Sequence, residues 1–284
     1  MVPALETHPG HGLSLRVHRW RPPAGTATAH TTVLLHGFLD AGSTWDLVAA
    51  PLAAAGHDVL APDLRGFGAS ERIAPSGYYH FPDYLADVDA LLRHALPPDA
   101  RPMLVGHSMG ATVAALYAGA SPERIGRLVL CEGVGPPAAG PRGTLDRTRQ
   151  WLRELAAREP SASPPVRRPQ GPSSLEDAAR RLAAHHPGVP AEVCASRAAL
   201  LTERGADGAL GWTHDPLHRT TSPTAFHLES FRAFLGEIRC PVLFVGGGAE
   251  GWHPVDEDER LAAIGAPLRR VELAGAGHMM HWTA

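Results

Sequence analysis

The chain contains 284 residues. It has 26 arginines, no lysine and 29 acidic residues, which gives a net charge of −3. Because the sequence has neither lysine nor asparagine, it excludes a Schiff-base lysine, a P-loop lysine and an N-glycosylation acceptor. The near-neutral charge disfavours a nucleic-acid-binding surface, and no apolar run reaches the roughly 18 residues that a membrane span needs.

The first half of the chain alternates short apolar strands with helices. Strand patterns are expected at residues 13–20, 31–35, 59–61, 102–106 and 127–130, and helical spacing at 45–55, 81–96 and 109–120. Short, continuous apolar strands that alternate with helices are typical of a parallel sheet covered on both faces. The pattern therefore predicts an α/β fold with a mostly parallel sheet flanked by helices.

The alternation stops after Gly135. Helical patches lie at about 144–158, 173–185 and 190–204, and none is followed by a strand of the earlier kind. The strand signal returns at 241–245, followed by a helix at 257–264 and a strand at 268–273. We therefore predict a core of residues 1–135 and 237–284, with residues 136–236 inserted after the sixth strand as a helical cap. Within it, residues 159–172 are expected to form a mobile loop, because proline and glycine interrupt them too often for a helix.

The sequence Gly106-His107-Ser108-Met109-Gly110 joins an apolar strand to an apolar helix. This is the context of a G-x-S-x-G nucleophile elbow, a turn so tight that the serine takes a strained backbone conformation. The turn lifts the hydroxyl above the sheet edge at the N-terminus of the next helix, where free amides favour developing negative charge. Ser108 is therefore the predicted nucleophile.

A serine nucleophile needs a base and an oxyanion hole. His278 follows the last predicted strand in a glycine-rich turn, which would let its imidazole reach over the carboxyl edge of the sheet. His281 is expected to be a neighbour of this base. Two backbone amides should hold the oxyanion, that of Met109 after the nucleophile and that of Phe38 after the 31–35 strand.

With these motifs in place, the chain resembles the capped, esterase-like branch of the α/β-hydrolase superfamily. The resemblance rests on residues 36–38 (His-Gly-Phe), 63–70 (Asp-Leu-Arg-Gly-Phe-Gly-Ala-Ser), 106–110 and 275–278 (Gly-Ala-Gly-His), which occur in the family's order. It covers nearly the whole chain and implies the α/β-hydrolase fold and a serine-hydrolase mechanism, but no substrate. The segment with Asp63 and Arg65 is expected to brace the loops of the site.

Two glutamates compete for the role of the acid that orients the imidazole. Glu132 ends the strand at 127–130, and a carboxylate buried there would need a partner such as His278. Similar members of the family place their acid after this strand. Glu250 follows the 241–245 strand, where the family usually has an aspartate, 28 residues before His278. Both alternatives stay open, and either carboxylate would also stabilise the imidazolium.

The remaining candidates concern the substrate pocket and metals. Gly37, His107 and Trp212 are predicted pocket residues. Further walls that core packing explains equally well are Phe38, Trp45, Met109, Trp252 and Met279. The histidines lack the spacing of a metal motif such as His-Glu-x-x-His, so neither a metal nor a cofactor is predicted.

The expected function is that of a cofactor-independent serine hydrolase acting on a carboxylic ester, thioester or lactone of a small molecule through an acyl-enzyme. A serine at the elbow disfavours the aspartate-dependent chemistry of dehalogenases and epoxide hydrolases. Carbon–carbon bond hydrolysis, acyl transfer or cyclisation with the same three residues stays an alternative. A different class of alternative is a ligand-binding sensor on a hydrolase fold.

The setting is predicted to be cytoplasmic. Cys131, Cys194 and Cys240 are widely spaced without a CxxC motif, and the first residues lack the basic and apolar regions of a secretory signal. The expected partner is a small-molecule acyl substrate and neither nucleic acid nor a membrane, while the oligomeric state is left open. Relatives usually continue past the catalytic histidine into a helix, whereas six residues follow His278 here. We therefore expect either a shortened sequence or a loop that is held in another way, and the rigidity of His278 depends on which of the two applies.

Overall fold

The computed structural model describes residues 1–284 except 27, 29, 75, 139, 159–170 and 284. The strands are β1 (Ala4–Pro9), β2 (Ser14–Trp20), β3 (His30–Leu35), β4 (His57–Pro62), β5 (Met103–His107), β6 (Arg127–Cys131), β7 (Thr202–Arg204), β8 (Leu210–Trp212), β9 (Val242–Gly246) and β10 (Leu268–Glu272). The α-helices are α1 (Asp46–Ala54), α2 (Phe81–Ala95), α3 (Met109–Ala120), α4 (Pro141–Arg158), α5 (Leu175–His185), α6 (Ala191–Leu201), α7 (Leu228–Glu237), α8 (Glu257–Ala262) and α9 (Met280–Thr283). Among the helices of these described residues, none has the length and apolar character needed to cross a membrane.

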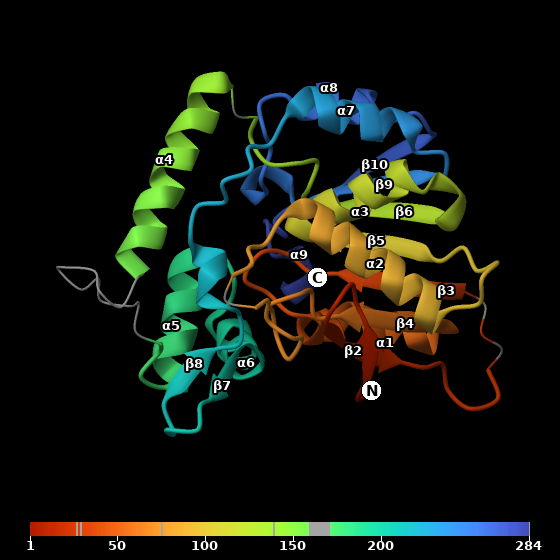
Figure 1. Cartoon of the computed structure of the whole chain (residues 1–284). Helices are drawn as coiled ribbons and strands as arrows, with labels where there is room; N and C mark the ends of the chain where they lie inside the picture. The colour runs from red at the N-terminus through yellow and green to blue at the C-terminus, as the bar shows by residue number, and fades with distance from the viewer. Residues whose placement is uncertain (27, 29, 75, 139, 159–170, 284) are drawn as a thin grey trace.

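One sheet organises the molecule (Figure 1). Its strand order is β1-β2-β4-β3-β5-β6-β9-β10. β1 and β2 run antiparallel to each other, and β2 runs antiparallel to β4, whereas the strands from β4 to β10 pair in parallel. The predicted mostly parallel sheet flanked by helices is therefore confirmed.

Side chains of the parallel strands alternate between two buried layers, as the period of a strand requires. In β3, Val33 and Leu35 belong to a cluster that α2, α3 and α7 complete. Leu34 points to the other face, where it joins a cluster that contains Ala49 and Ala53 of α1. Because both faces are covered by helices, these strands are continuous apolar runs, which is why the sequence revealed them clearly.

The predicted functional residues follow the carboxyl ends of five strands, at one edge of the sheet. Phe38 follows β3, Ser108 follows β5 and Glu132 follows β6. His278 follows β10, and the segment that contains Glu250 follows β9. Since β3, β5, β6, β9 and β10 are consecutive neighbours in the sheet, residues far apart in the sequence meet at this edge.

The insertion after β6 holds α4, α5, α6 and the antiparallel pair β7–β8, which lie together at one side of the sheet (Figure 1). Buried residues of α5 and α6 share a cluster with Met279 and Trp282 from the end of the chain. Arg197 of α6, nearly fully buried, donates to Asp46 of α1 at 2.6 Å. The division at residues 136 and 236 stays a prediction, since α7 lies inside those limits but contributes Phe231 to the core cluster of the sheet.

Several elements escaped the sequence patterns. The edge strand β1 is mostly exposed and so has no apolar alternation to reveal it. The helical patch expected to reach residue 204 ends at Leu201, because Thr202–Arg204 pairs with β8. The helix α7 was also not predicted. The mobile loop expected at 159–172 lies, over 159–170, outside the described residues.

The segment after His278 is held by burial, which agrees with the alternative of a loop that is held in another way. Met279, Met280, His281 and Trp282 are each at most 6% exposed. Met280 packs with the cluster that contains residues of α1, while Trp282 packs with residues of α5 and α6. The loop that carries His278 is therefore anchored on its C-terminal side.

The segment after β4 braces the loops of this edge, as its sequence suggested. Asp63 accepts hydrogen bonds from the amides of Gly42 and Ala69, at 2.7 and 2.8 Å. Arg65 binds both carboxylate oxygens of Asp87 in α2, at 2.6 and 2.7 Å, and both side chains are buried. A bidentate pair in this setting compensates two charges that would otherwise be costly to bury.

Replacing Asp87 by alanine leaves the Arg65 guanidinium buried without its carboxylate. We expect the free energy of unfolding to fall by about 3–5 kcal/mol, measured by urea denaturation. The matched control is Arg93→Ala, which removes an exposed ion pair with Asp89 on the same helix and should cost less than about 1 kcal/mol. Equal losses in the two variants would contradict this account of the brace.

Candidate active site

A hydroxyl, an imidazole and a carboxylate form a continuous chain at the carboxyl edge of the sheet. His278 Nε2 lies 3.1 Å from Ser108 Oγ, and His278 Nδ1 lies 3.2 Å from Glu132 Oε2. Both distances are within hydrogen-bonding range for a base and the groups on its two sides. The structure thus brings together Ser108, His278 and Glu132, while their roles remain predictions.

The turn that carries Ser108 is as tight as its sequence suggested. Ser108 has φ 51° and ψ −111°, a combination that non-glycine residues rarely adopt. A Cβ atom at Gly106 would lie 2.3 Å from the carbonyl oxygen of Gly110, and one at Gly110 would lie 2.2 Å from that of Leu35. Both glycines are therefore required by close backbone packing, which holds Ser108 at the first turn of α3.

Glu132 is held by more than His278. Its carboxylate is fully buried and accepts hydrogen bonds from the amide of Gly247, at 2.5 Å, and from the amide of Trp252. Burial would raise the pKa of this carboxyl, but the hydrogen bonds from His278 and the two amides outweigh it and lower the pKa. Glu132 is therefore ionised at neutral pH and can hold the imidazole in one orientation.

Strained backbone conformations occur at the carboxyl edge of the sheet. In the described part of the chain, the non-glycine residues with positive φ are Leu39, Ser108 and Glu132. Each follows a neighbouring parallel strand, and Ser108 and Glu132 belong to the chain of hydrogen bonds described above. Strained backbone persists where the surrounding structure enforces it, which is common at functional sites.

Glu250, the alternative acid, has a different place. Its side chain is exposed at the end of a short 3-10 turn, and the acid within hydrogen-bonding distance of His278 is Glu132. The segment around Glu250 contributes backbone instead, through the amides of Gly247 and Trp252. The sequence analysis missed these donors, although the two glycines at 246–247 signal a close backbone approach.

The loop after β3 is shaped by His36, a residue to which the sequence analysis gave no separate role. Its Nδ1 donates to the carbonyl of Gly37 at 2.7 Å, and its Nε2 accepts from the amide of Leu64 at 2.9 Å. Burial lowers the pKa of His36, so the ring is neutral with its proton on Nδ1. This bond fixes the backbone before Phe38, while Met109, as the first residue of α3, has an amide without an intrahelical acceptor.

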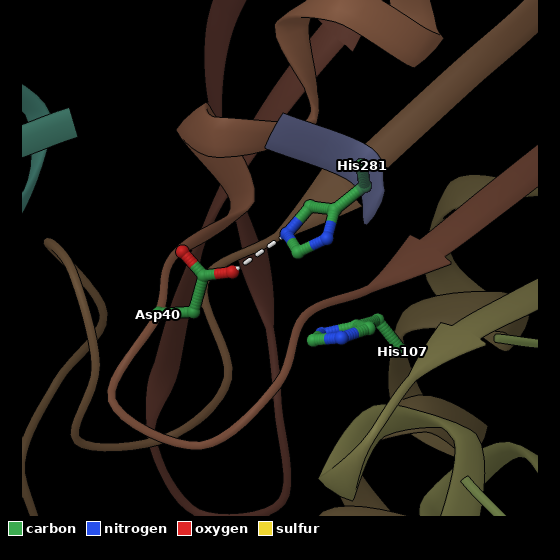
Figure 2. A group of neighbouring side chains, drawn as sticks. All are labelled: Asp40, His107 and His281. Atoms are coloured by element: carbon green, nitrogen blue, oxygen red, sulfur yellow. Dashed lines mark hydrogen bonds and ion pairs between the residues drawn. The ribbon is translucent and has the colours of Figure 1, made fainter. Parts of the chain in front are cut away.

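A histidine–aspartate pair, Asp40 and His281, lies near the site (Figure 2). His281 Nε2 lies 2.8 Å from Asp40 Oδ2, and both side chains are buried. The ring of His107 lies 4.3 Å from that of His281, and His107 Nε2 donates to the carbonyl oxygen of His278 at 2.7 Å. Burial, with His281 and His278 nearby, lowers the pKa of His107 well below its ordinary value, which leaves Nε2 protonated as the donor. The group links the loop after β3, the end of β5 and α9.

Among the described residues, these three form a group that could hold a metal ion, since one ligand atom of each lies within 4.8 Å of the others. However, His281 Nε2 and Asp40 Oδ2 bind each other, and His107 Nε2 binds a backbone carbonyl. The two imidazole rings also pack against each other, with planes 41° apart. We therefore interpret the cluster as a brace between loops.

A cavity of about 790 Å³ opens above Ser108. Phe38, Met109 and Trp252 line it, as do Glu132 and His278. The other predicted pocket residues lie outside its lining. Gly37 lies against the buried ring of His107, Trp212 stacks on His214, and Trp45 and Met279 are buried in the core.

Known proteins with similar sequences and structures were found. A family model described as "alpha/beta hydrolase fold" matches residues 33–284. A serine hydrolase-like protein of Dictyostelium discoideum is 24% identical over 259 residues, which cover 86% of this chain and 66% of that protein. The chain therefore spans slightly less than two thirds of that relative's length.

Two further comparisons cover nearly the full length of both proteins. Epoxide hydrolase A of Mycobacterium tuberculosis is 28% identical over 304 residues, which cover 95% of this chain and 90% of that enzyme. The thioesterase domain from the curacin biosynthetic pathway matches with a TM-score of 0.79 at 26% identity, over 100% of this chain and 96% of that domain.

The Asp40–His281 pair gives a pH-dependent prediction. Burial would raise the pKa of Asp40, but its hydrogen bond and charge interaction with His281 outweigh burial and lower the pKa below the ordinary 3.8. The stability that ionised Asp40 provides is therefore present above pH 3.8 and is lost as the pH falls through the lower, folded-state value. Asp40→Asn should lower the free energy of unfolding by about 2 kcal/mol at pH 7, and by less as the pH falls below 3.8.

Urea denaturation across pH 2.5–7 would measure this difference, with the exposed Asp99→Asn as the matched control. The control should match the original protein at every pH. A loss in Asp40→Asn that does not change with pH would contradict the assigned pairing.

Proposed function

The chain belongs to the α/β-hydrolase family, and from this premise we propose that it is a cofactor-independent serine hydrolase acting on a carboxylic ester, thioester or lactone of a small molecule. The observation that carries the proposal is the hydrogen-bonded chain from Ser108 through His278 to Glu132. Acyl transfer requires a nucleophile, a base and an orienting carboxylate in this same order, which supports the proposed roles.

In the first half of the proposed reaction, Ser108 Oγ attacks the substrate carbonyl carbon while His278 Nε2 takes the hydroxyl proton. His278 Nδ1 donates to ionised Glu132, which stabilises the imidazolium. The carbonyl oxygen becomes an oxyanion, and the amides of Phe38 and Met109 are the proposed donors to it. Such preorganised donors commonly supply about 3–4 kcal/mol each to the transition state.

The tetrahedral intermediate then collapses. The bond from the carbonyl carbon to the leaving group breaks, and the imidazolium returns its proton to that group, which leaves an acyl ester on Ser108. In the second half, His278 takes a proton from water as the water attacks the acyl carbon. Ser108 Oγ leaves and recovers a proton from the imidazolium, so the product acid is released and the resting state is restored.

The cavity supports a small-molecule substrate. Its volume of about 790 Å³ lies in the range of sites that enclose small organic ligands. Aromatic side chains from residues 78–84, which include the first turn of α2, and from residues 226–234 line the cavity, which suits an apolar acyl or alkyl group. Residues of the proposed cap, from Arg147 and from 217–234, complete the wall. We therefore propose that the cap selects the substrate.

Ser108→Ala should abolish turnover of p-nitrophenyl esters. Removal of the nucleophile is expected to lower kcat by about 10³-fold or more, because only binding and oxyanion stabilisation remain. The measurement is steady-state release of p-nitrophenol, with Ser196→Ala, which removes an exposed hydroxyl of α6, as the matched control. Turnover by Ser108→Ala comparable to that of the control would sink the proposed mechanism.

The two candidate acids can be separated in the same assay. Glu132→Gln removes the charge that holds the imidazole and should lower kcat by about 10²-fold or more. Glu250→Gln changes an exposed side chain and should leave kcat within about twofold, since surface changes are usually small. The reverse order of effects would assign the orienting role to Glu250.

A further inference from the structure

The cavity above Ser108 has an unbalanced charge. Two of its lining side chains, Glu132 and Arg147, carry permanent charge at neutral pH. The charge of Glu132 is compensated by two amides and by His278. His218, which also lines the cavity, is neutral, because burial lowers its pKa to about 3. Arg147 is thus the only arginine among the lining residues that the structure describes.

No carboxylate neutralises Arg147 in the part of the chain that the structure describes. The two acids of its own helix, α4, are engaged elsewhere. Asp146 pairs with Arg142 and Arg149, at 3.4 and 3.5 Å. Glu154 accepts two hydrogen bonds from another segment of the cap and one from a neighbouring glutamine. The guanidinium donors of Arg147 are therefore free to bind a ligand at the cavity.

The face of α4 that bears Arg147 is turned toward the cavity. Trp151, one turn later, packs edge-on against Tyr78, with ring centroids 6.1 Å apart. Glu154, two turns later, receives the amide of Thr221 at 2.6 Å. Residues three, four and seven apart share one side of a helix, so these two contacts fix the orientation of Arg147 as well.

The surroundings of Arg147 favour an anionic ligand. The rings of Tyr78, Phe81, Tyr84 and Phe226 line the same cavity and make much of its wall apolar. A guanidinium at the edge of such a wall binds an oxyanion through two parallel N–H donors, and displacement of water by the ligand strengthens the interaction. An uncharged substrate would leave these donors unused.

We infer that Arg147 recognises an oxyanion group of the substrate, such as a carboxylate, at a position remote from the reacting carbonyl. The inference rests on the proposed function, since it concerns the substrate of the same site. It narrows the substrate class from any small ester to one that carries a negative charge on its acyl or its alcohol part. In a chain without lysine, arginine is the only permanently charged cation that can make this contact.

Two matched pairs of esters test the inference and locate the charge. In the first pair, mono-p-nitrophenyl adipate carries a carboxylate on its acyl part, and p-nitrophenyl hexanoate is its neutral counterpart. In the second pair, 4-carboxyphenyl hexanoate carries the carboxylate on its alcohol part, and phenyl hexanoate is its neutral counterpart. We expect the anionic member of one pair to have about a tenfold higher kcat/KM, as a charge-assisted hydrogen bond provides. Equal values within both pairs would overturn the inference.

Arg147→Gln should remove that preference, because kcat/KM for the anionic ester should fall to about the value for its neutral counterpart. The matched control is Arg149→Gln, on the same helix but outside the cavity lining, which should keep the preference. Raising the salt concentration to 0.5 M should also reduce the preference, because salt screens an interaction at a solvent-accessible charge. If Arg147→Gln keeps the preference, the recognition of the anionic ester belongs to another group and the inference is wrong.

A binding measurement separates this inference from the proposed catalysis. Calorimetric titration of Ser108→Ala with monomethyl adipate and with methyl hexanoate compares an anionic and a neutral ligand without turnover. We expect about tenfold tighter binding of the anionic ligand, lost when Arg147→Gln is added. Tighter anion binding without any Ser108-dependent hydrolysis would reject the proposed function alone, whereas hydrolysis without an Arg147-dependent difference would reject the inference alone.

Discussion

The buried charge of Glu132 is the constraint around which this site is organised. A carboxylate with no solvent exposure must be compensated, and three groups do so: the amides of Gly247 and Trp252 and the imidazole of His278. These groups come from the segments after β9 and β10, so the carboxylate draws two loops toward the end of β6. The Asp40–His281 pair repeats the arrangement near the site and ties the loop after β3 to the same place.

The parallel part of the fold was predictable because burial on both faces makes each strand a continuous apolar run. The helix expected at 109–120 and the strand expected at 127–130 agree closely with α3 and β6. The elements that were missed obey other constraints. Exposed β1 is held by pairing with β2 rather than by apolar side chains. The paired strands β7 and β8 have three residues each, which is too short for a strand period to show in the sequence.

The parts of the site that a sequence motif specifies through backbone geometry were predictable. The parts whose position depends on contacts with residues distant in the sequence were not. The glycines on either side of Ser108 indicate the tight turn in the sequence, and the structure shows that a side chain at Gly106 or Gly110 would clash with the backbone. The choice between Glu132 and Glu250 could not be made from the sequence, because both follow strands that end at the same edge. The position of His107 beneath the loops, and not at the cavity, likewise depends on contacts with residues about 170 positions away in the chain.

The most direct test of the account is the identity of the residue that becomes acylated. Brief reaction with a slowly hydrolysed p-nitrophenyl ester, followed by acid quenching and mass spectrometry of proteolytic peptides, locates the covalent acyl group. The account predicts a single adduct on Ser108, with the mass of the acyl part, formed more slowly in Glu132→Gln. An adduct on another residue, or ester turnover with no covalent intermediate on Ser108, would contradict it.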